Sequence, residues 1–212
     1  MTLKKVSLVY YFLVFFIVLG CATEQQQKPN RPNIIYILAD DLGYGDLKHY
    51  NNNSKIKTPH LDRLARQGMS FMDMHSTSSV CTPTRYSILT GEYAWRTQLK
   101  KGVLWSYGPL MIPDQKETVA KLLQRNDYQT AVVGKWHLGV KKPYHPNRRG
   151  FDTFYGNLSG AVGYWDHVHG GHYDWQRNGK TVREEGYVTH LQAREAVRVA
   201  VSYTHLTLPT KA

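Results

Sequence analysis

Apolar runs of strand length alternate along the chain with segments whose apolar positions follow a helical spacing. The run 33–39, rich in β-branched residues, predicts a buried central strand of a parallel sheet. Further strands are predicted at 69–75 and 128–133. Suitable capping residues and helical spacing predict helices over 58–68 and 118–124. This alternation indicates an α/β fold with a mostly parallel or mixed sheet that is flanked by helices.

The N-terminal segment has the organisation of a secretory signal. Lys4 and Lys5 are followed by an almost unbroken apolar stretch of 14 residues, Val6–Leu19. A bilayer span needs about 20 residues, so the stretch is too short for a membrane helix. It ends in Leu19-Gly20-Cys21, which resembles the lipobox of bacterial lipoproteins, where the cysteine is lipidated and begins the mature protein. The alternative is an ordinary signal peptide that is cleaved nearby.

The lipoprotein interpretation sets the compartment and the state of the second cysteine. We expect residues 1–20 to be the signal peptide and the polar, proline-marked residues 21–32 to be a tether. The protein would then be exported and attached to a membrane through a lipid on Cys21, in the periplasm or at the outer membrane or cell surface. Cys81 would have no disulfide partner, and a lone cysteine in an exported protein suggests a reactive or modified thiol.

The charge of the chain favours an anionic partner. There are 27 Lys and Arg residues against 16 Asp and Glu, a formal net charge of +11. A membrane surface or a sulfated glycan would suit this charge, and a solvated basic surface is the plain alternative. The positive residues are scattered, and the sequence contains no recognisable nucleic-acid-binding module, so we expect no nucleic-acid partner.

Several polar residues follow directly after predicted strands. Asp40 and Asp41 come after the run 33–39, while Lys135 and His137 come after the run 128–133. Functional sites in α/β sheets form at the carboxyl ends of strands. Adjacent carboxylates offer hard oxygen ligands for Ca²⁺ or Mg²⁺, although such pairs are more often solvated or capping.

The segment 81–91, Cys-Thr-Pro-Thr-Arg-Tyr-Ser-Ile-Leu-Thr-Gly, is the most distinctive in the chain. If Cys81 starts a helix, backbone N–H groups and the helix dipole favour an anion beside it. Arg85 lies one helical turn further on, where a guanidinium could hold a nucleophile or an oxyanion. The alternatives are a small buried cysteine and a surface arginine.

Two further groups of residues could carry chemistry. Lys135 and His137 would point the same way on an extended segment, giving a cation for an anionic substrate and a proton carrier. A Lys-x-His pair alone is weak. His167, His169 and His172 could form a transition-metal site, but a glycine-rich loop near the pocket rim is the preferred interpretation.

From about residue 33 to residue 197 the chain resembles the N-terminal part of a sulfatase of the arylsulfatase type, in the alkaline-phosphatase-like superfamily. Four stretches carry the resemblance, and the cysteine signature is the most specific of them: Asp40-Asp41-Leu42-Gly43, Cys81 to Gly91, Tyr128 to His137, and Gly150-Phe151-Asp152 with Tyr155-Gly156. Asp127 departs from the family, which usually has glycine there.

The resemblance implies a role for each candidate. Asp40 and Asp41 would bind a divalent metal, usually Ca²⁺, with Mg²⁺ as the other choice. A formylglycine-generating maturation enzyme would convert Cys81 to formylglycine, whose hydrate contacts the metal and attacks sulfur. Arg85 would stabilise the hydrate, Lys135 would bind the sulfate group, and His137 would assist proton transfer when the intermediate collapses.

The resemblance also shows what a sulfatase has and this chain lacks. A His-x-Pro segment, an Asp-Asn metal motif and a second sulfate-binding lysine are not recognisable after His137. We therefore expect residues 33–201 to be the N-terminal part of a catalytic domain and 202–212 to be a non-native tail. A truncated chain of this kind is expected to be inactive on its own and poorly folded.

The expected function is hydrolysis of a sulfuric ester. The substrate would be a sulfated carbohydrate or an aryl sulfate, and a sulfated polysaccharide would suit the basic charge. One alternative is a phosphonate or phosphate monoester hydrolase that uses the same aldehyde. The other is a lipoprotein that binds anionic glycans without catalysis and keeps Cys81 unmodified.

Overall fold

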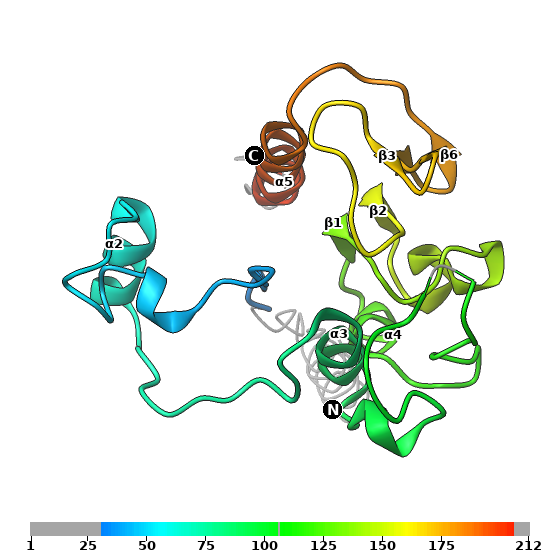
Figure 1. The fold of residues 1–212 in the computed structure, drawn as a ribbon, viewed down its shortest axis with the longest axis horizontal. Coiled ribbons are helices and arrows are strands. Elements are labelled where there is room, and N and C mark those ends of the chain that lie inside the picture. Colours follow the sequence, from blue (N-terminus) through cyan, green and yellow to red (C-terminus); the bar gives the residue numbers. More distant parts are fainter. Residues whose placement is uncertain (1–30, 106, 206–212) are drawn as a thin grey trace, which may run out of the picture. The chain divides into compact units, whose positions relative to one another are not determined.

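A computed structural model describes residues 31–105 and 107–205. The chain divides into two compact units, 1–36 and 37–212, and the elements below belong to the second. Figure 1 shows their order along the chain. The elements are η1 (Tyr44–Asp46), α2 (Pro59–Gln67), α3 (Cys81–Thr90), η2 (Ala94–Arg96), α4 (Val119–Arg125), β1 (Ala131–Lys135), η3 (Lys142–Tyr144), η4 (Pro146–Arg149), β2 (Thr153–Asn157), β3 (Val168–His169), β4 (His172–Tyr173), β5 (Gln176–Arg177), β6 (Lys180–Thr181) and α5 (Val188–His205).

The main sheet is mixed, with strand order β1-β2-β5-β6. β1 and β2 are parallel, in a register that pairs Ala131 with Thr153 and Lys135 with Asn157. The β2–β5 and β5–β6 pairs are antiparallel, and β3 and β4 form a separate hairpin. The α/β fold with a mixed sheet is confirmed, with one parallel pair among the described strands.

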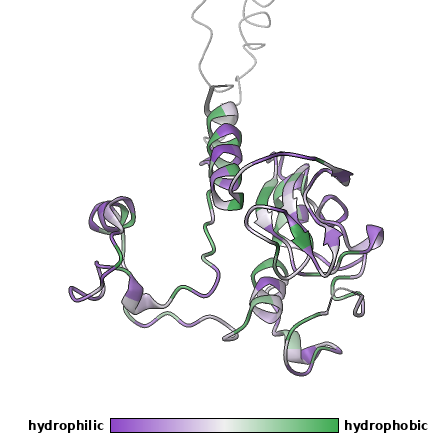
Figure 2. Cartoon of the chain, turned by 45° about the horizontal axis from the view of Figure 1, so that its top comes forward, coloured by the Kyte–Doolittle hydropathy of each residue, from purple (hydrophilic) through white to green (hydrophobic). Residues whose placement is uncertain are grey.

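Helices pack on both faces of this sheet because successive residues of a strand point to opposite sides. Phe154 of β2 belongs to a core cluster that includes Tyr86 of α3. Its neighbour Tyr155 belongs to a second cluster that includes Leu191 of α5. Figure 2 shows apolar residues on the central strands between these helices. The prediction that helices flank the sheet is therefore confirmed.

The helix predictions agree with the structure, and the capping chemistry explains why. α2 lies within the predicted 58–68, with proline in its first turn. α4 begins after Thr118, whose hydroxyl accepts a hydrogen bond from the backbone N–H of Lys121. α3 begins at Cys81 and ends at Gly91, which has a left-handed φ of 70°. Gly91 thus completes the 81–91 segment as the C-cap of α3.

Two strand predictions are wrong. Residues 33–39 and 69–75 form no strand, and their large apolar side chains are exposed. A strand needs a neighbouring strand to satisfy its backbone N–H and C=O groups, and no described strand pairs with either segment. The apolar composition of a segment does not show whether another strand lies next to it.

The third strand prediction is correct in type, but its bounds are displaced along the chain. β1 begins at residue 131 rather than 128 and ends at residue 135 rather than 133. Thr130 is held outside the strand, because its backbone N–H donates to the carboxylate of Asp152 and its hydroxyl donates to the carbonyl of Gly150. Asp127 has a left-handed φ of 60°, a conformation that favours glycine. This explains the departure noted in the sequence: the turn needs a left-handed residue, and aspartate is among the types that adopt it.

Some sequence predictions fall outside the described residues. These are the signal peptide, Cys21, most of the tether and residues 206–212. Among the described helices, none combines the length and the apolar character that crossing a bilayer requires.

Candidate active site

Three predicted site residues from separate segments meet at the carboxyl end of β1. Asp40 accepts a hydrogen bond from Lys135, with 2.7 Å between Nζ and Oδ2. The other carboxylate oxygen of Asp40 lies 3.4 Å from Nη2 of Arg85. Arg85 also donates from Nη1 to the backbone carbonyl of Lys135 at 2.6 Å. The structure therefore gathers one carboxylate and two cations around the end of a strand, where the sequence predicted a site.

The two cations stabilise the ionised form of the Asp40 carboxylate. Burial by itself would raise the pKa of Asp40, but the hydrogen bond and positive charge of Lys135, helped by Arg85, outweigh burial and lower that pKa. Asp40 is consequently ionised at neutral pH. Its next neighbour, Asp41, is exposed and has a left-handed φ of 59°, a backbone conformation that aspartate adopts more readily than most residues.

Cys81 is the first residue of α3, half-buried, with a free thiol. Cys81 thus lies at the start of a ten-residue helix, as the sequence predicted, where backbone N–H groups have no partner within the helix. Nε of Arg85 is buried and has no hydrogen-bond partner among the described residues. Unpaired donors of this kind favour an added oxygen-rich group near the start of α3.

His137 lies deep beside this cluster. Its side chain is buried, and Nε2 lies 3.0 Å from the backbone carbonyl of Leu104. Burial lowers the pKa of His137 to about 4, and the positive charge of Lys135 adds to the effect. The ring is therefore neutral at neutral pH, while Nδ1 is buried without a partner among the described residues.

The sequence argument for the relative direction of Lys135 and His137 is wrong. β1 ends at Lys135, and His137 has a left-handed φ of 55°, so the two residues do not share an extended segment. Their proximity comes from the turn after the strand. Electrostatic coupling between them remains, because Lys135 contributes to the lowered pKa of His137.

The carboxylates fit a divalent metal in kind but supply only part of its ligands. Asp40 and Asp41 offer hard oxygen atoms, and Ca²⁺ takes about six to eight of them. The described part of the chain contains no group of three or more His, Cys, Asp or Glu residues that could hold a metal ion. The side chains of Lys135 and Arg85 now contact the oxygens of Asp40.

Among the described residues, the histidines at 167, 169 and 172 are not gathered into a group that could hold a metal ion. His167 is buried, with Nδ1 3.2 Å from the hydroxyl of Tyr173 and Nε2 3.0 Å from the carbonyl of Gly186. Its ring stacks on Trp175. His169 and His172 pair across the β3–β4 hairpin, whose turn is Gly170-Gly171. The interpretation as a glycine-rich loop agrees with this hairpin.

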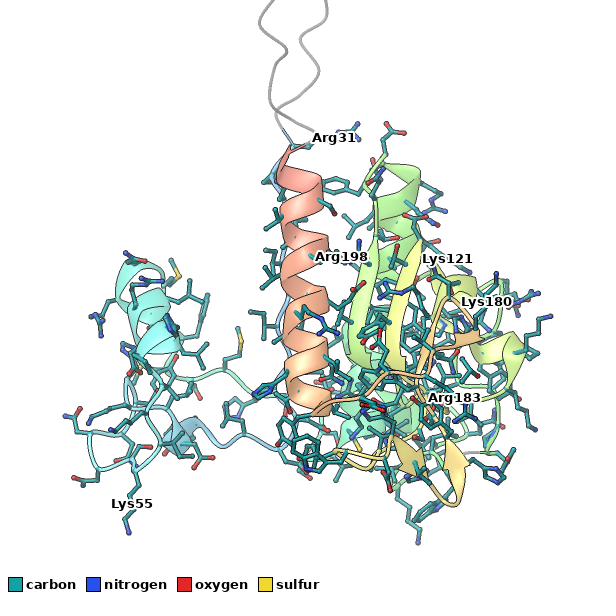
Figure 3. The ribbon with its side chains drawn as sticks, turned by 90° about the horizontal axis from the view of Figure 1, so that it is seen from above. Arg31, Lys55, Lys121, Lys180, Arg183 and Arg198 are labelled. Carbon is teal, nitrogen blue, oxygen red and sulfur yellow. The ribbon has the colours of Figure 1, made fainter. Side chains whose placement is uncertain are left out.

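The basic side chains are distributed rather than gathered into one patch. Figure 3 labels several of them, some in helices or strands and others in the segments between these elements. Lys121 of α4 donates to the backbone carbonyls of Asp114 and Lys116. Arg198 and Arg177 both pair with Glu195 and lower its pKa to about 2 against the opposing effect of burial. These three basic residues therefore have local structural partners.

Sequence reasoning missed three residues that surround His137. These are Thr82, Leu104 and Gly160. Thr82 stands inside the 81–91 segment, so its position was visible, but its contacts were not. Leu104 acts through its backbone and Gly160 through the absence of a side chain, and neither leaves a signal in the sequence.

Comparison with known proteins assigns these residues to a family. A family model described as Sulfatase matches residues 32–197. Arylsulfatase H of Canis lupus familiaris is 43% identical over 141 residues, which cover 61% of this chain and 25% of the relative. The N-acetylgalactosamine-6-O-sulfatase of Bacteroides thetaiotaomicron is 46% identical over 125 residues, 57% of this chain and 24% of the relative. The chain thus spans about a quarter of the length of these relatives.

Solved structures show the same fold over a larger share of the chain. The crystal structure of Ps i-CgsB has a TM-score of 0.71 and 34% identity, covering 81% of this chain and 41% of that one. BT4656 in complex with its substrate D-glucosamine-2-N,6-O-disulfate has a TM-score of 0.61 and 32% identity, covering 79% of this chain and 31% of that one.

Proposed function

The chain belongs to the sulfatase family, and from this premise we propose that its protein hydrolyses sulfate esters with a nucleophile generated from Cys81. The observation that carries the proposal is the convergence of Asp40, Arg85 and Lys135 at the end of β1. The 81–91 segment, which brings Cys81 and Arg85 onto one helix, lies within the matched residues 32–197.

The nucleophile is proposed to arise by conversion of Cys81 to formylglycine. As a hydrate, formylglycine would supply one oxygen that bonds to sulfur as the bond between sulfur and the alcohol oxygen breaks. Loss of the proton from its second hydroxyl would then break the bond to the sulfate group and restore the aldehyde. Arg85 suits this position because its buried, unpaired Nε can donate to an oxygen of the modified side chain.

Lys135 stabilises negative charge, and His137 transfers a proton. Lys135 places an ammonium group at the end of β1, where it binds an anionic sulfate group and stabilises charge on its oxygens in the transition state. His137, neutral at neutral pH, is able to take a proton and so assist the release of sulfate.

The divalent metal is proposed to bind Asp40 and Asp41, with Ca²⁺ the first choice and Mg²⁺ the second. Their hard oxygens are the ligands that such ions prefer. When held by these carboxylates, such an ion would supply positive charge that stabilises negative charge on the sulfuryl oxygens. Lys135 and Arg85 lower the pKa of Asp40, so this residue would be a charged carboxylate when a cation binds.

The substrate is proposed to be a sulfated carbohydrate. One relative is named as an N-acetylgalactosamine-6-O-sulfatase. Two similar structures hold carbohydrates: k-i-k-neocarrahexaose in one and D-glucosamine-2-N,6-O-disulfate in the other. We further propose that the protein is exported and attached to a membrane through lipid on Cys21, which would place the enzyme where polysaccharides are encountered.

The test is a comparison of substrates with a matched inactive variant. A full-length version of the protein is produced together with a formylglycine-generating enzyme and assayed on an aryl sulfate, an aryl phosphonate and a sulfated monosaccharide. Sulfate release that disappears in Cys81→Ala supports the proposal. Turnover of the phosphonate at a higher kcat/KM than the sulfate, or binding of the sulfated sugar without any turnover, would contradict it.

A further inference from the structure

The hydroxyl of Thr82 connects the first turn of α3 to the segment that follows β1. Thr82 is fully buried. Its Oγ1 donates to the backbone carbonyl of His137 at 3.2 Å and accepts from the backbone N–H of Leu104 at 3.1 Å. The hydroxyl therefore uses its donor and an acceptor position at once, which fixes its direction.

A third hydrogen bond joins Leu104 to the imidazole ring of His137. The carbonyl of the same Leu104 lies 3.0 Å from Nε2 of His137. A carbonyl oxygen only accepts, so Nε2 must carry the proton. In a neutral imidazole the other nitrogen then holds a lone pair, and Nδ1 of His137 is buried with no partner among the described residues.

A glycine lies against the same edge of the ring, the edge that carries Nε2. A Cβ atom at Gly160 would lie 2.6 Å from both Cε1 and Nε2 of His137. Contacts that short do not occur, so the backbone at residue 160 approaches the Nε2 edge as only glycine allows. The ring is thus confined on the edge that carries its proton, while Nδ1 remains available.

We propose that Thr82 is the positioning residue of His137, and that Thr82, Leu104 and Gly160 hold the imidazole as a single tautomer with the proton on Nε2. Nδ1 is then the atom that accepts a proton during the reaction. Because Thr82 follows Cys81 in the chain, the same bonds tie the start of α3 to the residues after β1. The tautomer is argued from these contacts alone, whereas the proton transfer at Nδ1 rests on the proposed sulfatase function.

The test reads the tautomer directly, by nitrogen NMR of the protein labelled with ¹⁵N-histidine near neutral pH. His137 is assigned with a His137→Gln variant. The variants are Thr82→Val, which keeps the shape and loses the hydroxyl, Thr82→Ser, which keeps the hydroxyl, and Gly160→Ala, which pushes on the ring. Thr84→Val is the matched control, because the hydroxyl of Thr84 bonds elsewhere, to the carbonyl of Ser78.

We expect a protonated Nε2 and an unprotonated Nδ1 in the starting protein, in Thr82→Ser and in Thr84→Val. Thr82→Val and Gly160→Ala should show mixed tautomers or a ring whose signals broaden. A proton on Nδ1 in the starting protein, or an unchanged tautomer in both Thr82→Val and Gly160→Ala, would overturn the proposal. If Thr82→Val does not fold, the starting protein, Thr82→Ser and Gly160→Ala still decide it.

Measurements of kcat and KM, set beside the NMR result, distinguish failure of the positioning proposal from failure of the proposed sulfatase function. Thr82→Val should lower kcat by about tenfold or more, with less change in KM, because a misplaced proton carrier affects the transition state most. Thr82→Ser should recover most of that loss. A single Nε2-protonated tautomer in a full-length version that carries formylglycine but releases no sulfate would contradict the sulfatase function and leave the positioning intact. Full activity in Thr82→Val would contradict the positioning alone.

Discussion

Lys135 and Asp40, 95 positions apart in the sequence, form an ion pair in which Nζ lies 2.7 Å from a carboxylate oxygen. Arg85 adds a second cation to the same carboxylate and a hydrogen bond to the backbone of Lys135. The pair ties the segment that follows residues 33–39 to the end of β1. It also places the lysine that we propose to bind sulfate within hydrogen-bond distance of a carboxylate that we propose to bind the metal.

Removing the ammonium group of Lys135 should abolish most of the activity. We expect Lys135→Ala to lower kcat/KM for an aryl sulfate by about 100-fold or more, because a charge aimed at the sulfuryl oxygens acts most strongly in the transition state. Lys180→Ala is the matched control, since Lys180 is an exposed lysine of β6. Equal kcat/KM values in the two variants would show that Lys135 does not bind the sulfate group.

Metal binding should depend on the two adjacent carboxylates. Titration with Ca²⁺ by calorimetry is expected to show at least about tenfold weaker binding in both Asp40→Asn and Asp41→Asn, because each change replaces a charged hard ligand with a neutral amide. Asp46→Asn is the control, as this carboxylate accepts a bond from the backbone of Gly43 instead. A calcium affinity that is unchanged by both substitutions would rule these residues out as ligands.

The stability of the protein should fall as the solution becomes acidic. Burial lowers the pKa of His137 to about 4 from an unfolded value of 6.5, so the unfolded chain binds more protons between these values. The free energy of unfolding therefore falls as pH drops from 6.5 towards 4, by at most about 3 kcal/mol from this group. The pKa of His145 is lowered by burial too, and adds in the same direction.

Urea midpoints at pH 7 and pH 5 measure this dependence. In His137→Gln the difference between the two midpoints should shrink, because the contribution of His137 is lost. It should not vanish, because the lowered pKa of His145 still contributes. A difference as large as in the unmodified protein would show that His137 is not held neutral by the fold.

The parallel contact between β1 and β2 should depend on a pair of glycines. A Cβ atom at Gly156 would lie 2.1 Å from the carbonyl oxygen of Gly134, its partner in the register. We expect Gly156→Ala to lower the free energy of unfolding by about 3 kcal/mol or more, from the clash together with its left-handed φ of 142°.

Gly102→Ala is the control that separates the two causes. Gly102 also has a left-handed φ, of 73°, but no atom lies within 4 Å of the added carbon. Its cost should be only about 1 kcal/mol, from the backbone conformation alone. Equal losses of stability in the two variants would mean that the strand contact is looser than the structure describes.

The sequence predicted the features that depend on local chemistry. The start of α3 at Cys81 and the cap of α4 at Thr118 follow from residue types and spacing. The sequence also placed Asp40 and Lys135 after apolar runs. Their direct contact requires the turn of the chain that brings the two segments together, which no local pattern contains.

The failures concern partners that lie far away in the sequence. Residues 33–39 have the composition of a buried strand, but a strand forms only where another strand accepts its backbone hydrogen bonds. The hydrogen bonds around His137 come from a side chain 55 positions away and a backbone group 33 positions away. Residue types do not encode which distant carbonyl or N–H group will be adjacent.

The central claim is that Cys81 is the precursor of the nucleophile, and peptide mass spectrometry tests it most directly. The protein is produced with an active formylglycine-generating enzyme, and the peptide that contains residues 81–85 is weighed beside that of a control substrate of the same enzyme. The account predicts a loss of about 18 Da when the thiol becomes an aldehyde. A cysteine of unchanged mass that reacts fully with iodoacetamide, while the control substrate is converted, would contradict the account.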